Sequence, residues 1–138
     1  MDMLNVTIDG VKVSVPAGTT VLEAARKANI HIPTLCYLKD INQIGACRMC
    51  VVDVGARALA AACVMPVSEG MVVKTNTPAV RAARKSVLEL ILSNHKRECL
   101  SCVRSQNCEL QKLAQELGAD ENRFCGANID YPLDEISP

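Results

Sequence analysis

The chain has 138 residues, eight cysteines and equal numbers of acidic and basic side chains, so its formal net charge is zero. This length allows one ordinary domain or two small ones, and small domains bury so little apolar surface that metal clusters can supply missing stability. The neutral charge and the scarcity of aromatic residues, which are Tyr37, Phe124 and Tyr131, argue against a nucleic-acid partner.

The first residues, MDMLNVTIDG, lack the basic and apolar regions of a secretory signal. No apolar run approaches the roughly 20 residues that a membrane span needs. We therefore expect a soluble, cytoplasmic protein with no direct membrane insertion. In that reducing compartment the cysteines are expected to bind metal and not to form a disulfide framework.

The first elements in the chain are predicted to be a hairpin and a helix. Apolar and polar residues alternate around Asp9-Gly10, which predicts strands over 3–8 and 11–15. Thr20 and Glu23 form a capping box for a helix of about ten residues that ends near Asn29. A hairpin followed by a helix laid across it is typical of the start of a β-grasp domain.

Residues 37–46 show no periodicity and predict an irregular loop, which continues into GACRMC. A loop suits a metal cluster, because thiolates must converge and backbone N–H groups must turn toward sulfur; Gly45 and Ala46 permit that close approach. VVDV then predicts a strand and ALAAAC a return strand toward Cys63, although the alanines favour a helix by propensity. Residues 67–75 predict the last strand of the sheet.

A boundary is predicted near Asn76, where Thr77 caps a second helix that begins at Pro78 and ends just before His95. Its predicted apolar positions recur at helical spacing and are Val80, Ala83, Val87, Leu88, Leu90, Ile91 and Leu92. A third helix follows and is closed by Gly118 at its C′ position. We expect domains over 1–76 and 77–118, followed by a linker or tail over 119–138.

Seven cysteines and one histidine fall into two groups of four. Each group offers the number of soft or borderline ligands that closes the coordination of one iron–sulfur cluster, which predicts an electron-transfer protein with two clusters. The first group is Cys36, Cys47, Cys50 and Cys63, and the second is His95, Cys99, Cys102 and Cys108.

Each group has an alternative interpretation. Four such ligands could hold zinc, although zinc sites usually pair two C-x2-C units and each group here has one. His95 could be a helix-terminal histidine that interacts with the helix dipole. Cys125 lies outside both groups and is expected to be a free thiol. The nearby basic residues are expected on a solvated face or as a screen for the anionic clusters; they are Arg81, Arg84, Lys96, Arg97 and Arg104.

The segment IGACRMCVVDVG, with Cys36 and Cys63, followed by HKRECLSCVRSQNCELQKLAQELG, resembles an N-terminal region shared by several redox enzymes. These are the iron-only hydrogenases, the large iron–sulfur (75 kDa-type) subunit of complex I and NAD-dependent formate dehydrogenases. The resemblance covers nearly the whole chain. It implies an α+β fold in which a β-grasp, plant-ferredoxin-like domain holds a 2Fe-2S cluster on the first group. A small helical domain would hold a 4Fe-4S cluster on the second group.

The function that this resemblance implies is electron transfer within an iron-only, NAD(P)-linked hydrogenase-type oxidoreductase, as a subunit or N-terminal fragment. The alternatives are the equivalent part of complex I or of a formate dehydrogenase, and a structural zinc module. No catalytic residue is predicted, because no GxGxxG precedes a helix and no further cysteines could hold a hydrogen-forming cluster. The expected partners are a flavin- or NAD(P)-binding diaphorase subunit and a hydrogenase or dehydrogenase catalytic part.

Overall fold

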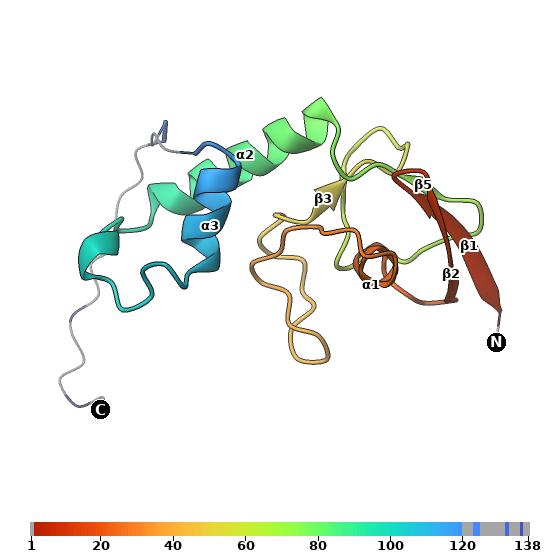
Figure 1. Cartoon of the computed structure of the whole chain (residues 1–138), viewed down its shortest axis with the longest axis horizontal. Helices are drawn as coiled ribbons and strands as arrows, with labels where there is room; N and C mark the ends of the chain where they lie inside the picture. Colours follow the sequence, from red (N-terminus) through yellow and green to blue (C-terminus); the bar gives the residue numbers. More distant parts are fainter. Residues whose placement is uncertain (1, 120–122, 125–131, 133–135, 137–138) are drawn as a thin grey trace.

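The computed structural model describes residues 2–119, 123, 124, 132 and 136. It contains a small sheet with one helix beside it, and a helical part connected to the sheet by a long helix (Figure 1). The first part comprises β1 (Met3–Ile8), β2 (Val11–Pro16), α1 (Val21–Lys27), β3 (Val51–Val52), β4 (Ala60–Ala61) and β5 (Val72–Val73). The second part comprises α2 (Pro78–Ser93), the 3-10 helix η1 (Cys99–Ser101) and α3 (Glu109–Glu116).

The predicted hairpin is confirmed, and its first strand, β1, is the central strand of the main sheet. Asp9 and Gly10 have φ angles of 49° and 83°, which is the left-handed backbone that a tight hairpin turn requires. β1 pairs antiparallel with β2 and parallel with β5, so the strand order is β2-β1-β5. Two segments that lie far apart in the sequence are therefore joined in one sheet.

The first helix begins where it was predicted and ends earlier. The Thr20 hydroxyl accepts a hydrogen bond of 3.3 Å from the Glu23 N–H, as an N-cap should. The helix ends at Lys27 and not near Asn29, because Asn29 has a φ of 57° and leaves the helical conformation. The Glu23 carboxylate accepts a hydrogen bond of 2.6 Å from the Tyr37 hydroxyl, which fastens the following loop onto α1.

The later strands are shorter than predicted. The return strand is confirmed, since Val51 pairs with Ala61 and Val52 with Ala60 in a separate two-stranded sheet. The prediction of a continuous strand over 67–75 was wrong. Gly70 has a φ of 73° and donates its N–H to the Asn5 carbonyl, so the chain turns along the edge of β1 before β5 begins.

Two groups of buried apolar side chains lie on either side of β3. The first fills the space between the main sheet, α1 and the β3–β4 hairpin, and its largest fully buried members include Ile8, Leu22 and Val52. The second lies between α2 and α3 and consists of Met49, Leu88, Leu92, Leu113, Ala114 and Ala119. Met49 comes from the loop before β3, so the second core contains a residue of the first part of the chain.

The two longer helices have the predicted ends. The Thr77 hydroxyl caps α2 by accepting the Val80 N–H at 3.2 Å. After α3, Gly118 has a φ of 64°, and the Ala119 N–H donates to the Ala114 carbonyl at 2.9 Å, as in a Schellman motif. None of the helices within the described residues is long and apolar enough to cross a bilayer.

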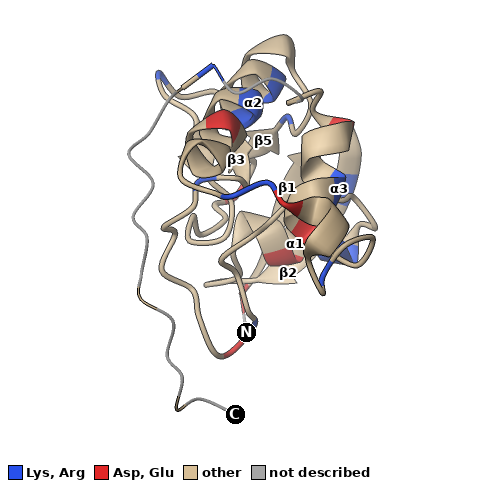
Figure 2. Cartoon of the chain, turned by 90° about the vertical axis from the view of Figure 1, so that its left-hand side faces the viewer, with Lys and Arg blue, Asp and Glu red and all other residues tan. Residues whose placement is uncertain are grey.

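The buried face of α2 differs from the predicted stripe. Leu90 is 55% exposed, whereas Arg84 and Glu89 are buried. The expectation that Arg84 belongs to a solvated face was therefore wrong. Elsewhere both signs of charge are distributed along the helices (Figure 2).

Candidate metal centres

The β3–β4 hairpin brings two cysteines of the first group together. Cys50 directly precedes β3 and Cys63 follows β4 by two residues, and both are 2% exposed. The Ala62 N–H donates to the Cys50 carbonyl at 3.2 Å, which aligns the two ends of the hairpin. The prediction that this hairpin returns Cys63 toward Cys50 is confirmed.

The other two cysteines of this group lie at the ends of the irregular loop. The Cys47 N–H donates to the Cys36 sulfur at 3.4 Å, and the Met49 N–H donates to the Cys47 sulfur at the same distance. Such N–H groups stabilise thiolates and coordinated sulfur. Burial alone would raise the pKa of Cys47, but hydrogen bonds with the backbone of Met49, Cys36 and Leu35 lower it below the ordinary value.

The other three thiols of the first group act on Cys63. Burial raises the pKa of the Cys63 thiol to about 12, and a hydrogen bond with Cys50 and negative charge at Cys50, Cys36 and Cys47 add to the effect. Four thiolates at this spacing repel one another unless positive charge lies between them. A core of iron ions supplies such charge, so the donor set suits a cationic cluster.

The loop that carries Cys36 and Cys47 has an irregular backbone held by specific contacts. Asp40, Gly45 and Arg48 all have positive φ angles, and a Cβ on Gly45 would lie 3.2 Å from the Val64 side chain. The Val64 side chain therefore leaves little room for a larger residue at Gly45, while the predicted approach of the Gly45 and Ala46 backbone to sulfur stays a prediction. The Asn42 amide donates to the Cys36 carbonyl at 2.8 Å, which fixes the backbone at the first predicted ligand.

Tyr37 connects the same loop to α1. Burial, together with its hydrogen bond to the Glu23 carboxylate, raises the pKa of Tyr37 to about 12. The same hydrogen bond lowers the pKa of Glu23. The Arg26 guanidinium lies over the Tyr37 ring at 4.8 Å from its centroid, which adds a cation–π contact. The residue next to Cys36 is therefore held firmly against α1.

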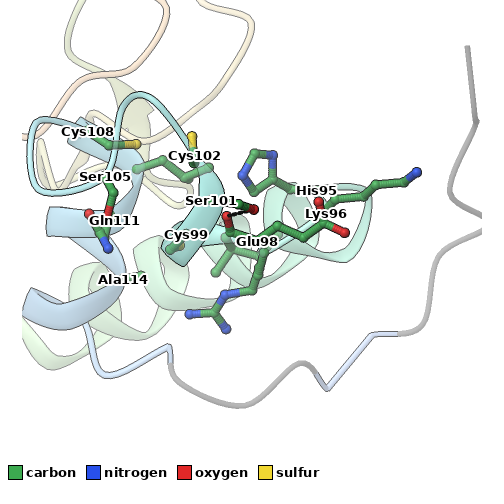
Figure 3. Close-up of a pocket in the computed structure, with 13 residues that line it drawn as sticks. His95, Lys96, Glu98, Cys99, Ser101, Cys102, Ser105, Cys108, Gln111 and Ala114 are labelled. Atoms are coloured by element: carbon green, nitrogen blue, oxygen red, sulfur yellow. Dashed lines mark hydrogen bonds between the residues drawn. The ribbon is translucent and has the colours of Figure 1, made fainter. Parts of the chain in front are cut away.

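The second group surrounds one cavity of about 270 Å³ between the end of α2, η1 and the start of α3. His95 lies just beyond the C-cap of α2, Cys99 begins η1, and Cys108 is the N-cap residue of α3. The Arg104 N–H donates to the Cys102 sulfur at 3.4 Å. The four predicted ligands of this group line the same cavity and come from three short segments (Figure 3).

The structure also shows the bonding state of the cysteines that it describes. The seven cysteines within the described residues are free thiols. Cys125 lies outside the described residues. Across the described part of the chain, no three His, Cys, Asp or Glu side chains are gathered as ligands of a single metal ion.

The burial of three residues was not predicted from the sequence, although Arg84 was among the residues named as a possible screen for the clusters. Met49 lies between two predicted ligands, Cys47 and Cys50, and is fully buried in the second core. Arg84 donates from Nη2 to the Val51 carbonyl at 2.9 Å, across the boundary between the two parts of the chain. Glu89 accepts two bonds from Arg123, at 2.6 and 2.9 Å. The inward position of Arg84 could have been predicted from the sequence, since it lies one helical turn from both Val80 and Leu88.

Two family models match this chain in tandem. The model described as a 2Fe-2S iron-sulfur cluster binding domain matches residues 1–78, and the one described as an NADH-ubiquinone oxidoreductase-G iron-sulfur binding region matches residues 84–123. Each matched range contains one of the two groups of predicted ligands. The zinc alternative receives no support from either match.

Similar proteins include subunits of two kinds of redox complex. The NADP-reducing hydrogenase subunit HndD of Solidesulfovibrio fructosivorans is 48% identical over 99% of this chain and 24% of its own length. The NADH-ubiquinone oxidoreductase 75 kDa subunit of Reclinomonas americana is 42% identical over 88% of this chain and 18% of its own length. The chain thus spans about a quarter or less of these relatives.

A solved structure has the same fold. A chain in the crystal structure of an NAD+-reducing [NiFe]-hydrogenase in the H2-reduced state superimposes with a TM-score of 0.90 at 30% identity. The match covers 98% of this chain and 57% of that chain. The predicted α+β, ferredoxin-like fold is confirmed by this likeness.

Proposed function

Because this chain belongs to the 2Fe-2S iron-sulfur cluster binding domain family, within the N-terminal iron–sulfur region common to hydrogenase and NADH dehydrogenase subunits, we propose that it relays electrons inside an iron-only, NAD(P)-linked hydrogenase-type oxidoreductase. The chain binds one 2Fe-2S and one 4Fe-4S cluster and has an electron-transfer role in such enzymes. The observation that carries the hydrogenase assignment is the identity of 48% with the HndD subunit over 99% of the chain.

The proposal assigns four ligands to each cluster. Support for the first set comes from the pKa of Cys63, which the nearby thiols of Cys36, Cys47 and Cys50 help to raise. Support for the second set comes from the shared cavity. The 2Fe-2S cluster is proposed on Cys36, Cys47, Cys50 and Cys63, and the 4Fe-4S cluster on His95, Cys99, Cys102 and Cys108.

The protein's part in the relay is to hold the clusters and to set their potentials. Each cluster, when bound, accepts and releases one electron at a time. The N–H groups of Cys47, Met49 and Arg104 donate to ligand sulfurs, and such bonds favour the more negative, reduced state.

We propose a division into domains over 1–76 and 77–118 and a linker or tail over 119–138.

The relatives are subunits of multi-subunit redox assemblies, so redox partner subunits are implied for this chain as well. We propose a flavin- or NAD(P)-binding diaphorase subunit as one partner and a hydrogenase catalytic part as the other. A cytoplasmic location is part of the proposal, since thiolate ligands persist in a reducing compartment. The equivalent relay in complex I is the second candidate, which the match of residues 84–123 favours.

Metal analysis of anaerobically purified protein tests the assignment. We expect about six irons and about six acid-labile sulfides per chain, with two distinct EPR signals after reduction. Cys50→Ala should remove the 2Fe-2S signal and leave the 4Fe-4S signal, while Cys102→Ala should remove the 4Fe-4S signal, lower the iron content and leave the 2Fe-2S signal. Bound zinc without sulfide would overturn the proposal, and loss of both signals from either variant would contradict the division of ligands.

A further inference from the structure

Arg84 is a buried cation beside the first group of cysteines. It lies on α2 in line with Val80 and Leu88, on the face that packs inward, and is 6% exposed. Its Nη2 donates to the Val51 carbonyl at 2.9 Å, and Val51 directly follows the cysteine at position 50. The guanidinium is therefore carried by the second part of the chain but held against the backbone of the first.

The charges around Arg84 explain how a guanidinium can be buried there. Burial lowers the pKa of Arg84, and negative charge at Cys50 and Asp9 opposes that change. An arginine keeps its proton in spite of such a shift, so the group remains a cation. Its Nε is buried and has no hydrogen-bond partner within the described residues. Hydrogen bonds thus compensate only part of the lost hydration, and nearby negative charge must compensate the rest.

The strongest negative charge expected nearby is that of the loaded 2Fe-2S centre. Four thiolates and an oxidised core of about +2 give a net charge of about −2, and uptake of one electron makes it about −3. A fixed, buried cation stabilises the reduced state more than the oxidised state, because the attraction grows with the negative charge. Removing the cation must therefore lower the reduction potential.

Resting on the proposed 2Fe-2S assignment, we propose that Arg84 is a positioning residue whose buried charge raises the reduction potential of the 2Fe-2S centre. It acts across the boundary between the two parts of the chain and fixes the backbone next to a ligand. The alternative role is that of a structural clip, in which the hydrogen bond to Val51 matters and the charge does not. The two roles differ in what a neutral hydrogen-bond donor does to the potential.

The test is a redox titration of the loaded, full-length protein, followed by EPR of both clusters. Arg84→Gln keeps a side-chain N–H but removes the charge. We expect the midpoint potential of its 2Fe-2S centre to fall by at least about 59 mV. For one electron this shift corresponds to a tenfold change in the ratio of oxidised to reduced protein. The 4Fe-4S midpoint of the same sample is the internal reference and should move much less.

Lys85→Gln is the matched control. Lys85 is the next residue on α2, but it is exposed, so its charge is screened by water and salt. Loss of the Lys85 charge should change the ratio of oxidised to reduced 2Fe-2S centre by less than roughly twofold, and raising the salt concentration should abolish that change. The effect of Arg84→Gln should persist in high salt. Equal shifts in the two variants would overturn the proposal.

Arg84→Lys decides the matter if the glutamine variant fails to load iron. It keeps the charge but loses the planar guanidinium, so a midpoint near that of the unaltered protein, with lower thermal stability, supports the proposal. A midpoint that falls although the charge is retained contradicts it. Failure of the unaltered protein to give a 2Fe-2S signal would instead refute the proposed function, so the two failures can be told apart.

Discussion

His95 differs chemically from the other seven proposed ligands. Imidazole is neutral where a thiolate carries a negative charge, so a cluster with one histidine has one negative charge fewer than a cluster held by four cysteines. Its ring lines the same cavity as the three cysteines of the second group (Figure 3). The charge difference should raise the reduction potential of this cluster.

Two substitutions at His95 separate a ligand from a neighbour. His95→Cys should still assemble a 4Fe-4S cluster, at a lower potential because one negative charge is added. His95→Ala should leave one iron without a protein ligand, so the cluster should convert readily to a three-iron form while the 2Fe-2S signal persists. EPR and redox titration measure both outcomes.

Cys125→Ser is the matched control, because this residue lies outside both groups of ligands and should not affect either cluster. If both His95 variants retained the original 4Fe-4S spectrum and potential, His95 would be a helix-terminal residue only. The fourth ligand would then have to be found elsewhere, and loss of the 4Fe-4S signal in Cys125→Ser would identify it.

At the scale of elements, α2 carries two buried charged residues with different partners. Arg84 faces the first part of the chain, whereas Glu89 accepts two bonds from Arg123, which follows α3. The Glu89 side chain is 3% exposed and that of Arg123 is 59% exposed. The ion pair therefore attaches Arg123, after α3, to α2. Because the Glu89 carboxylate is buried and Arg123 is not, the carboxylate is the group that would be destabilised if the pair were lost.

Breaking this pair from its exposed side should destabilise the helical part. Arg123→Met leaves the Glu89 carboxylate buried without its partner, which should cost about 1–3 kcal/mol after allowance for the exposure of Arg123. The double variant Glu89→Met with Arg123→Met should recover most of that loss, since two apolar side chains can replace a buried pair. Thermal unfolding, monitored by the 4Fe-4S absorption, measures both. A double variant as unstable as the single one would contradict the explanation.

The elements also show which features the sequence could predict. The hairpin at Asp9-Gly10, the caps at Thr20 and Thr77 and the helix end at Gly118 depend on local chemistry, and all were predicted correctly. The turn at Gly70 was missed, because the apolar residues around it fit a strand equally well. The grouping of the proposed ligands was predicted from their number and spacing, because four donors are needed to complete the coordination of one cluster.

Buried polar residues were harder to predict, because their burial depends on partners far away in the sequence. Arg84 bonds to a carbonyl 33 residues earlier, and Glu89 bonds to a guanidinium 34 residues later. Apart from helical spacing relative to buried neighbours, the local sequence does not distinguish such residues from a solvated charged face. Four-residue spacing from Val80 and Leu88 was the one local sign that Arg84 faces inward.

At the scale of the molecule, side chains of the first cluster region pack into the core of the second, namely Met49 and, at the edge of that core, Leu35 and Cys47. The sequence predicts separable domains, and the cap at Thr77 is consistent with an independent start of α2. Met49, however, is fully buried among Leu88, Leu92 and Leu113, although it belongs to the loop that carries the first group of cysteines. The two regions should therefore stabilise each other even if each can bind its own cluster.

Met49→Ala measures this mutual stabilisation when it is made in two proteins, the full chain and residues 1–76 expressed alone. In the full chain it should lower the free energy of unfolding by about 2–4 kcal/mol, because it creates a cavity in the second core. In residues 1–76 the same side chain has lost the helices that bury it, so the change should be within about 0.5 kcal/mol. Leu22→Ala, which lies in the first core, should destabilise both proteins and serves as the control. The measurement is the urea midpoint at which the 2Fe-2S absorption disappears. Equal effects of Met49→Ala in the two proteins would mean that Met49 packs mainly within the first region and does not couple the two regions.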